Sequence, residues 1–207
     1  MNKEPSAMFE ETVYTGVDFS DAEILEEELS GMQFIRCTFN GADFSQIRLS
    51  GCRFEQCRFS GTAFNGVEAV RCAFIGCSFS YANCFASSFR DCKMTGTDFS
   101  GCVMDAVTID RGDWRMTALS GYDFSGEKLS DVSFAESDLH GSRFDRCVFS
   151  RCDLTGADIH GASFRKADLR SCKLDQLHLD SADFKDAKID LTQAVAFAET
   201  FGVKVIL

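Results

Sequence analysis

Three classes of protein are excluded by what this 207-residue chain lacks. No apolar run approaches the ~18 residues of a membrane-spanning helix, so no membrane span is expected. The first eleven residues are polar and acidic, without a basic or an apolar segment, so no secretory signal peptide is expected either. Lysine and arginine number 21 against 32 aspartates and glutamates, and the net charge of −11 argues against direct binding of nucleic acid or of anionic membranes.

Catalytic and metal-binding motifs are missing as well. The sequence contains no P-loop, no GxSxG, no GxGxxG and no HExxH. There are only 3 histidines, and no Cys-x-x-Cys pair occurs among the 11 cysteines, which excludes the common zinc sites. Without a secretion signal, these cysteines are expected to be reduced thiols. The sequence therefore predicts a cytoplasmic protein that is not an enzyme and holds no cofactor or metal.

Phenylalanine, in contrast, is abundant, and it recurs every five residues. The chain has 21 Phe against 3 Tyr and 1 Trp, and 18 of the Phe lie at every fifth position between Phe9 and Ile189. The other positions of this column are large and apolar except Ala69 and Cys84. Ten cysteines lie two residues before this column, and 14 of the 16 glycines lie two residues after it. A five-residue period fits neither a helix nor a strand. It predicts a chain that turns a corner every five residues, with buried small and large side chains on each side and glycine at the corner.

The repeating unit, as in residues 41–45 (GADFS), resembles that of the pentapeptide-repeat family, A(D/N)LXX. The resemblance covers residues 9–190 and implies an all-β solenoid, a right-handed quadrilateral parallel β-helix of about nine coils with about 20 residues in each. Coils one strand spacing apart, ~4.8 Å, would make residues 1–190 a rod roughly 43 Å long.

Residues 109–127 fit the repeat least well. Gly112 stands just before the single Trp, Met116 lies at an outward corner, and Tyr122 and Glu127 occupy positions expected to be small and inward. The register is intact, so compensated packing within the coil is the favoured interpretation. The alternative is a surface bump around Met116 and Tyr122 that a partner recognises.

A second module is expected at residues 191–207, where the repeat ends. Asp190 is a suitable N-cap with Gln193 at N3, helical spacing follows, and Gly202 fits the position after the helix. Residues 203–207 predict a short apolar strand. This helix and strand would cover the open end of the last coil and form a homodimer, the alternative being a monomeric cap. The expected dimerisation residues are Leu191, Val195, Phe201, Val203, Val205 and Leu207.

The histidines fall into columns with aspartates when the sequence is written in rows of 20 residues. Asp138, Asp158 and His178 form one column, and His140, His160 and Asp180 form the next. A metal site on such a face is disfavoured, because an exposed flat face offers poor tetrahedral closure. An acidic patch that contacts a partner, centred on Asp138, Asp158 and Asp180, is the preferred hypothesis.

The resemblance extends to the Qnr and MfpA subgroup, because a helix and an apolar strand follow the repeats. This subgroup implies a type II topoisomerase as partner, DNA gyrase or topoisomerase IV, and protection of that enzyme from quinolone-type poisons or modulation of its activity. An acidic dimer on the order of 90 Å long would mimic duplex DNA. The alternative function is that of a generic protein-interaction or structural solenoid without a topoisomerase partner.

Overall fold

The computed structural model describes residues 8–206, and within them the backbone repeats itself every 20 residues. Thr38, for example, forms parallel bridges with Asp18 on one side and Arg58 on the other. The contacts divide the chain into two compact units that meet between Ile109 and Asp110. Residues 1–7 of the polar N-terminal stretch and Leu207 of the expected C-terminal strand lie outside the described residues.

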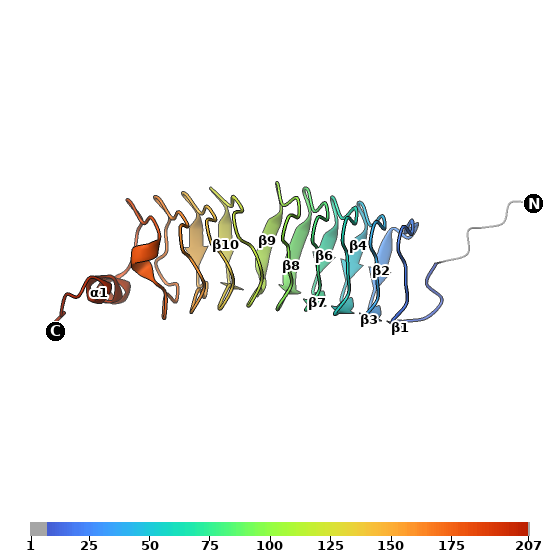
Figure 1. Ribbon diagram of the computed structural model, residues 1–207, viewed down its shortest axis with the longest axis horizontal. Helices are drawn as coiled ribbons and strands as arrows, with labels where there is room; N and C mark the ends of the chain where they lie inside the picture. Colours follow the sequence, from blue (N-terminus) through green and yellow to red (C-terminus); the bar gives the residue numbers. More distant parts are fainter. Residues whose placement is uncertain (1–7, 207) are drawn as a thin grey trace, which may run out of the picture. The chain divides into compact units, whose positions relative to one another are not determined.

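The N-terminal unit is built from short parallel strands in successive coils (Figure 1). Two ladders run through it, β1-β3-β5-β7 and β2-β4-β6-β8, and each pairing joins residues 20 apart, as in Phe34 with Phe54. The strands are β1 (Val13–Thr15), β2 (Glu28–Ser30), β3 (Gln33–Ile35), β4 (Arg48–Ser50), β5 (Arg53–Glu55), β6 (Glu68–Val70), β7 (Ala73–Ile75) and β8 (Ser88–Lys93).

The C-terminal unit continues the same winding with fewer strands and ends in helices. β10 pairs with β12 and β11 with β9, again with a 20-residue offset, and isolated bridges such as Asp153 with Lys173 join the later coils. In Figure 1 the red helix α1 lies at the end of this unit. The elements are β9 (Thr108–Asp113), which crosses the unit boundary, β10 (Lys128–Ser130), β11 (Val132–Ser133), β12 (Val148–Ser150), the 3₁₀ helix η1 (Leu179–Ser181) and α1 (Leu191–Thr200).

The predicted parallel β-solenoid is confirmed, but it has about seven turns instead of nine. Regular strands run from β1 (Val13–Thr15) to β12 (Val148–Ser150), and only isolated bridges join the coils after β12. The last coil loses its regular spacing at η1. The Gly141 amide bonds to the His160 carbonyl, which is 19 residues further along the chain, whereas the Gly161 amide bonds to the Ser181 carbonyl, which is 20 residues further along. A terminal coil has a neighbour on one side only, so fewer backbone bonds hold it in register.

Phenylalanine rings fill the N-terminal unit in stacked columns. Phe39, Phe59 and Phe79 are fully buried and lie parallel, with centroid distances of 5.1 and 4.5 Å. Rings of adjacent sides meet edge to face, as Phe54 does with Phe59 at 5.4 Å. Both arrangements are favoured by the aromatic quadrupole. The five-residue period therefore marks the inward side chains, as the sequence predicts.

All eleven cysteines are free and buried, and several of them make the same bond to the preceding coil as serine and threonine do. The Cys57 thiol donates to the Phe34 carbonyl, 23 residues back, at 3.3 Å. The Thr62 hydroxyl makes the same bond to Phe39 at 2.7 Å. The position takes a small side chain, as alanine shows, and cysteine, serine and threonine can in addition donate to a carbonyl of the preceding coil.

These thiols are expected to resist modification in the folded protein. Burial raises the pKa of the Cys147 thiol to about 12, so at pH 8 it stays protonated and unreactive. Ellman's reagent should label few thiols in native protein and all eleven after unfolding in denaturant. A Ser100→Cys variant, with its thiol at an exposed position, is the positive control and should react at once. Rapid native labelling of Cys52, Cys72 and Cys92 would contradict the buried column.

Residues 110–127 stay within the coil. The Leu119 amide bonds to the Asp138 carbonyl and the Phe124 amide to Arg143, both with the regular 19-residue offset. Trp114 is fully buried, and Gly112 beside it has φ of +134°, a conformation that a side chain would strain. The register is therefore continuous through this segment, as compensated packing requires.

The expected C-terminal strand is absent from residues 203–206, which is a correction to the sequence prediction. A strand forms when its amides and carbonyls pair with a neighbouring strand, and none of residues 8–206 supplies such a strand to residues 203–206. The helix before it is confirmed. Asp190 and Gln193 form a reciprocal capping box, and Gly202 has φ of +76°.

Candidate interaction surfaces of the C-terminal unit

Two adjacent sides of the C-terminal coils carry contrasting charge. Side A consists of residues 117–121, 137–141, 157–161 and 177–181, and side B of residues 122–126, 142–146, 162–166 and 182–186. Side A holds three aspartates and three histidines and no lysine or arginine. Side B holds arginines and lysines in successive coils.

Two of the three carboxylates of side A are oriented by hydrogen bonds from their own backbone. Asp138 and Asp158 form a parallel bridge, and both side chains are exposed. Their Oδ1 atoms accept hydrogen bonds from the amides of His140 and His160, each at 3.0 Å. The two imidazoles stack with centroids 5.4 Å apart. The 20-residue period has thus placed like groups one above the other, as the sequence predicts.

A shallow hollow of about 370 Å³ brings four ionisable groups of side A together, Asp158, His160, His178 and Asp180. Asp180 belongs to η1 and lies one column away from Asp138 and Asp158. None of these three aspartates forms an ion pair with a lysine or arginine of residues 8–206. The same residues contain no cluster of His, Cys, Asp and Glu suited to a metal ion. Side A therefore presents uncompensated negative charge.

Met116 and Tyr122, expected together at a bump, lie on different sides of their coil. Met116 is 58% exposed at a corner with φ of +59°. Tyr122 is half-buried, its amide bonds to the Ser142 hydroxyl at 3.3 Å, and the five residues 117–121 separate the two. The structure does not combine them into one surface.

Helix α1 closes the last coil through a single buried glutamine. The Gln193 side-chain amide donates to the carbonyls of Leu169 and Cys172, both at 2.8 Å. The Asp190 carboxylate accepts from the amides of Gln193 and Ser171, and these bonds lower its pKa. Backbone groups that the next coil would otherwise bind are satisfied in this way.

Apolar side chains remain uncovered around α1. A hollow of about 340 Å³ lies between the last coil and the helix, where Phe184 and Phe197 meet edge to face at 4.9 Å. Among the expected dimerisation residues, Leu191, Phe201, Val203 and Val205 are exposed, while Val195 is half-buried. Ile206, next to them, is 92% exposed.

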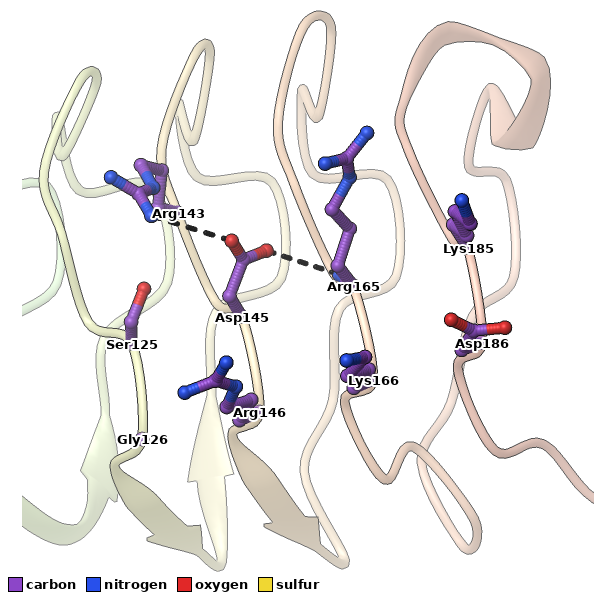
Figure 2. Close-up of a pocket in the computed structure, with 9 residues that line it drawn as sticks. All are labelled: Ser125, Gly126, Arg143, Asp145, Arg146, Arg165, Lys166, Lys185 and Asp186. Atoms are coloured by element: carbon purple, nitrogen blue, oxygen red, sulfur yellow. Dashed lines mark hydrogen bonds and ion pairs between the residues drawn. The ribbon is translucent and has the colours of Figure 1, made fainter.

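A basic cleft on side B was missed from the sequence. This cleft of about 460 Å³ contains five cations and two carboxylates (Figure 2). Its lining residues are Ser125, Gly126, Arg143, Asp145, Arg146, Arg165, Lys166, Lys185 and Asp186. The 20-residue period would have revealed it, because Arg146 and Lys166 fall into one column and Arg165 and Lys185 into another. The net charge of the chain does not reveal such columns.

Asp145 lies between two of these arginines and is strongly engaged. It accepts from the Ser163 hydroxyl at 2.5 Å, from the Arg165 amide at 3.1 Å and from Arg143 Nη2 at 3.4 Å. The bond from Ser163 is the largest cause of the lowered pKa of this carboxyl group. Outside the cleft lining, Asp123 pairs with Arg143 at 3.4 Å and Asp183 with Arg165 at 2.5 Å.

The coil has sides of five residues, and large and small side chains alternate in its interior. These features define a solenoid built from five-residue repeats, and sequence comparison identifies the same repeats. The family pattern described as pentapeptide repeats (8 copies) matches residues 15–51, 42–80, 128–165 and 162–194, and that described as pentapeptide repeat region matches residues 67–144. The chain belongs to the pentapeptide-repeat family. No curated protein sequence gives a significant match to it.

Among solved structures, the chain is similar to that of QnrB1, described as a plasmid-mediated fluoroquinolone resistance protein. The full-length structure has a TM-score of 0.74 at 20% identity, covering 92% of this chain and 100% of QnrB1. A trypsin-treated variant of QnrB1 gives 0.67 at 23% identity, with 94% and 100% coverage. At this identity the likeness shows the fold. None of the helices in residues 8–206 has the length and apolar character needed to cross a bilayer.

Proposed function

We propose that this protein is a cytoplasmic DNA mimic that binds a type II topoisomerase, DNA gyrase or topoisomerase IV, and protects it from quinolone-type poisons or modulates its activity. The observation that carries the proposal is side A of the C-terminal unit, where exposed carboxylates repeat from coil to coil without a neighbouring cation. Coils repeat at ~4.8 Å, a spacing of the same order as that of phosphates along a nucleic acid strand. The fold shared with QnrB1, a fluoroquinolone resistance protein, supports the choice of partner.

Side A would act by occupying the basic groove in which a topoisomerase holds DNA. Asp138 and Asp158 are oriented by bonds from the amides of His140 and His160, so the cost of ordering them on binding is small. Their charge would chiefly speed association. Met116 and Tyr122, on two other parts of the coil, could only contribute separate contacts.

Residues 191–207 form the proposed capping and dimerisation module. The exposed apolar groups of Leu191, Phe201 and residues 203–206 support pairing with a second copy, because apolar groups gathered at one end of a soluble protein favour association. The unpaired segment 203–206 could acquire the strand conformation predicted from its sequence when it meets a partner segment.

The test is gyrase supercoiling in the presence of ciprofloxacin, with this protein titrated in. Supercoiling is expected to persist at drug concentrations that stop it otherwise, and affinity for gyrase should fall steeply with salt. Exchanging Asp138, Asp158 and Asp180 together for asparagine should weaken gyrase binding about tenfold and flatten the salt dependence. The protein should stay folded, since all three side chains are exposed.

The matched control exchanges Glu10, Glu11 and Glu23 for glutamine, which removes as much charge from exposed positions of the N-terminal unit. This control should retain near-native affinity. If it weakens binding as much as the side A variant does, net charge and not side A is responsible. A wild-type protein that neither binds gyrase nor alters drug sensitivity would leave the generic interaction solenoid as the function.

A further inference from the structure

The basic cleft of side B holds three exposed cations outside its ion pairs, although Lys185 contributes to the lowered pKa of Asp183, first through the bond from its amide and also through its charge. Arg146, Lys166 and Lys185 are exposed and form no ion pair with any of residues 8–206. Arg143 and Arg165 border the same cleft and share their charge with Asp145, Asp123 and Asp183. Arg146 and Lys166 are thus the least compensated cations of the cleft, although the whole chain carries −11.

The cations form an array fixed by the coil. Arg146 and Lys166 follow each other in one column, Arg165 and Lys185 in the next, and each step is one coil of ~4.8 Å. Figure 2 shows Arg146 and Lys166 at the same level of successive coils, with Arg165 and Lys185 in a second level. The coil backbone fixes the spacing between the residues that carry these charges. An anion with several charged groups would therefore contact more than one of them at once.

The carboxylates of side B offset much of its positive charge but leave a net excess of cations. Asp145 is occupied by the Ser163 hydroxyl, the Arg165 amide and Arg143, so its charge is compensated locally. Asp186 lies on the last of the lined coils, beside Lys185 (Figure 2). It would repel an anion that extended past Lys185 and so limits the length of the ligand.

We propose that this cleft binds a small ligand that carries two or more linked phosphate groups. Guanidinium and ammonium groups are the usual ligands of phosphate oxygens. The cleft volume of about 460 Å³ falls within the range of small-molecule sites. An extended nucleic acid is disfavoured because it would have to run beyond the cleft, past Asp186 or over the acidic side A. A small ligand interacts mainly with charges within ~8 Å at physiological salt, because more distant charges are screened.

Calorimetric titration of the full chain in EDTA at fixed ionic strength tests the site with three phosphate probes and with a duplex oligonucleotide as a fourth ligand. Tripolyphosphate is expected to bind at least tenfold more tightly than inorganic phosphate. ATP then distinguishes the sources: equal affinity for ATP and tripolyphosphate means that the phosphate chain alone is recognised, and tighter ATP binding means that the ligand is a nucleotide. Either outcome supports the cleft. Equal affinity for all three probes, or binding of a duplex oligonucleotide in preference to tripolyphosphate, overturns it.

The site is assigned by a pair of double variants. Arg146→Gln with Lys166→Gln should weaken tripolyphosphate binding at least tenfold and leave the thermal transition unchanged. The control, Lys128→Gln with Lys188→Gln, removes the same charge from exposed residues of another side of the same unit and should bind as the wild type does. If both variants lose affinity equally, binding reflects net charge and the cleft is not the site. Gyrase binding by the cleft variant should be unchanged, so this proposal and the topoisomerase proposal fail separately.

Discussion

Replacing Phe59 with alanine is expected to lower the free energy of unfolding by about 3–5 kcal/mol, the range for a large buried aromatic side chain. Phe59 is fully buried and stacks on Phe39 and Phe79 at 5.1 and 4.5 Å. It also meets Phe54 and Phe64 of the adjacent sides edge to face. A solenoid coil has contact only with its two neighbours, so the cavity cannot be filled by a rearrangement of distant parts.

Chemical denaturation followed by circular dichroism measures the effect, with Ser60→Ala as the matched control. Ser60 is the next residue and points outward, and its amide, not its hydroxyl, bonds to Asn40, so the control should change stability by less than about 0.5 kcal/mol. Equal tolerance of both substitutions would mean that the five-residue register is assigned to the wrong side chains.

The parts of the fold predicted from sequence are those that depend on a local period. Because Phe recurs at every fifth position, the period alone indicates that these side chains point inward. The column of Phe39, Phe59 and Phe79 could therefore be assigned from the sequence. The same holds for the ten cysteines two residues before the every-fifth column, which the period places inward and the structure buries. The capping box at Asp190 and Gln193 is likewise a property of four consecutive residues.

The errors lie where the outcome depends on neighbours that the period does not specify. The strand expected at residues 203–207 needs a partner, and no residue of the described chain supplies one to 203–206. The number of turns depends on how far the terminal coils hold their register, which η1 interrupts.

The charged surfaces show both cases. Asp138 and Asp158 were placed together by the 20-residue period, and the structure stacks them. The same period also places Arg146 and Lys166 in one column of the basic cleft, which the net charge of the chain does not reveal. Met116 and Tyr122 were grouped because they are close in sequence, although a complete side of the coil separates them.

The C-terminal residues are expected to have two separate roles: α1 caps the last coil, and the residues after Phe201 form the dimer contact. Removing residues 191–207 would expose the carbonyls of Leu169 and Cys172, which Gln193 now binds, together with the apolar end of the last coil. Such a protein should aggregate or unfold. A chain that ends at Phe201 keeps α1 and its capping box and loses the exposed residues Val203, Val205 and Ile206, so it should stay folded and become monomeric.

Sedimentation velocity of the full chain and of both truncations measures these outcomes. The Gln193→Ala substitution tests the cap separately from the dimer contact. That substitution leaves two carbonyls without their donor and should cost about 1–3 kcal/mol of stability while the mass stays that of a dimer. A full-length protein that sediments as a monomer would remove the dimer from the topoisomerase proposal and leave the cap alone. A dimer that persists in the chain ending at Phe201 would place the contact on α1 itself, where Leu191 is the most exposed apolar residue. In that case the unpaired segment 203–206 has no part in assembly, and the strand predicted from its apolar sequence does not form in the dimer either.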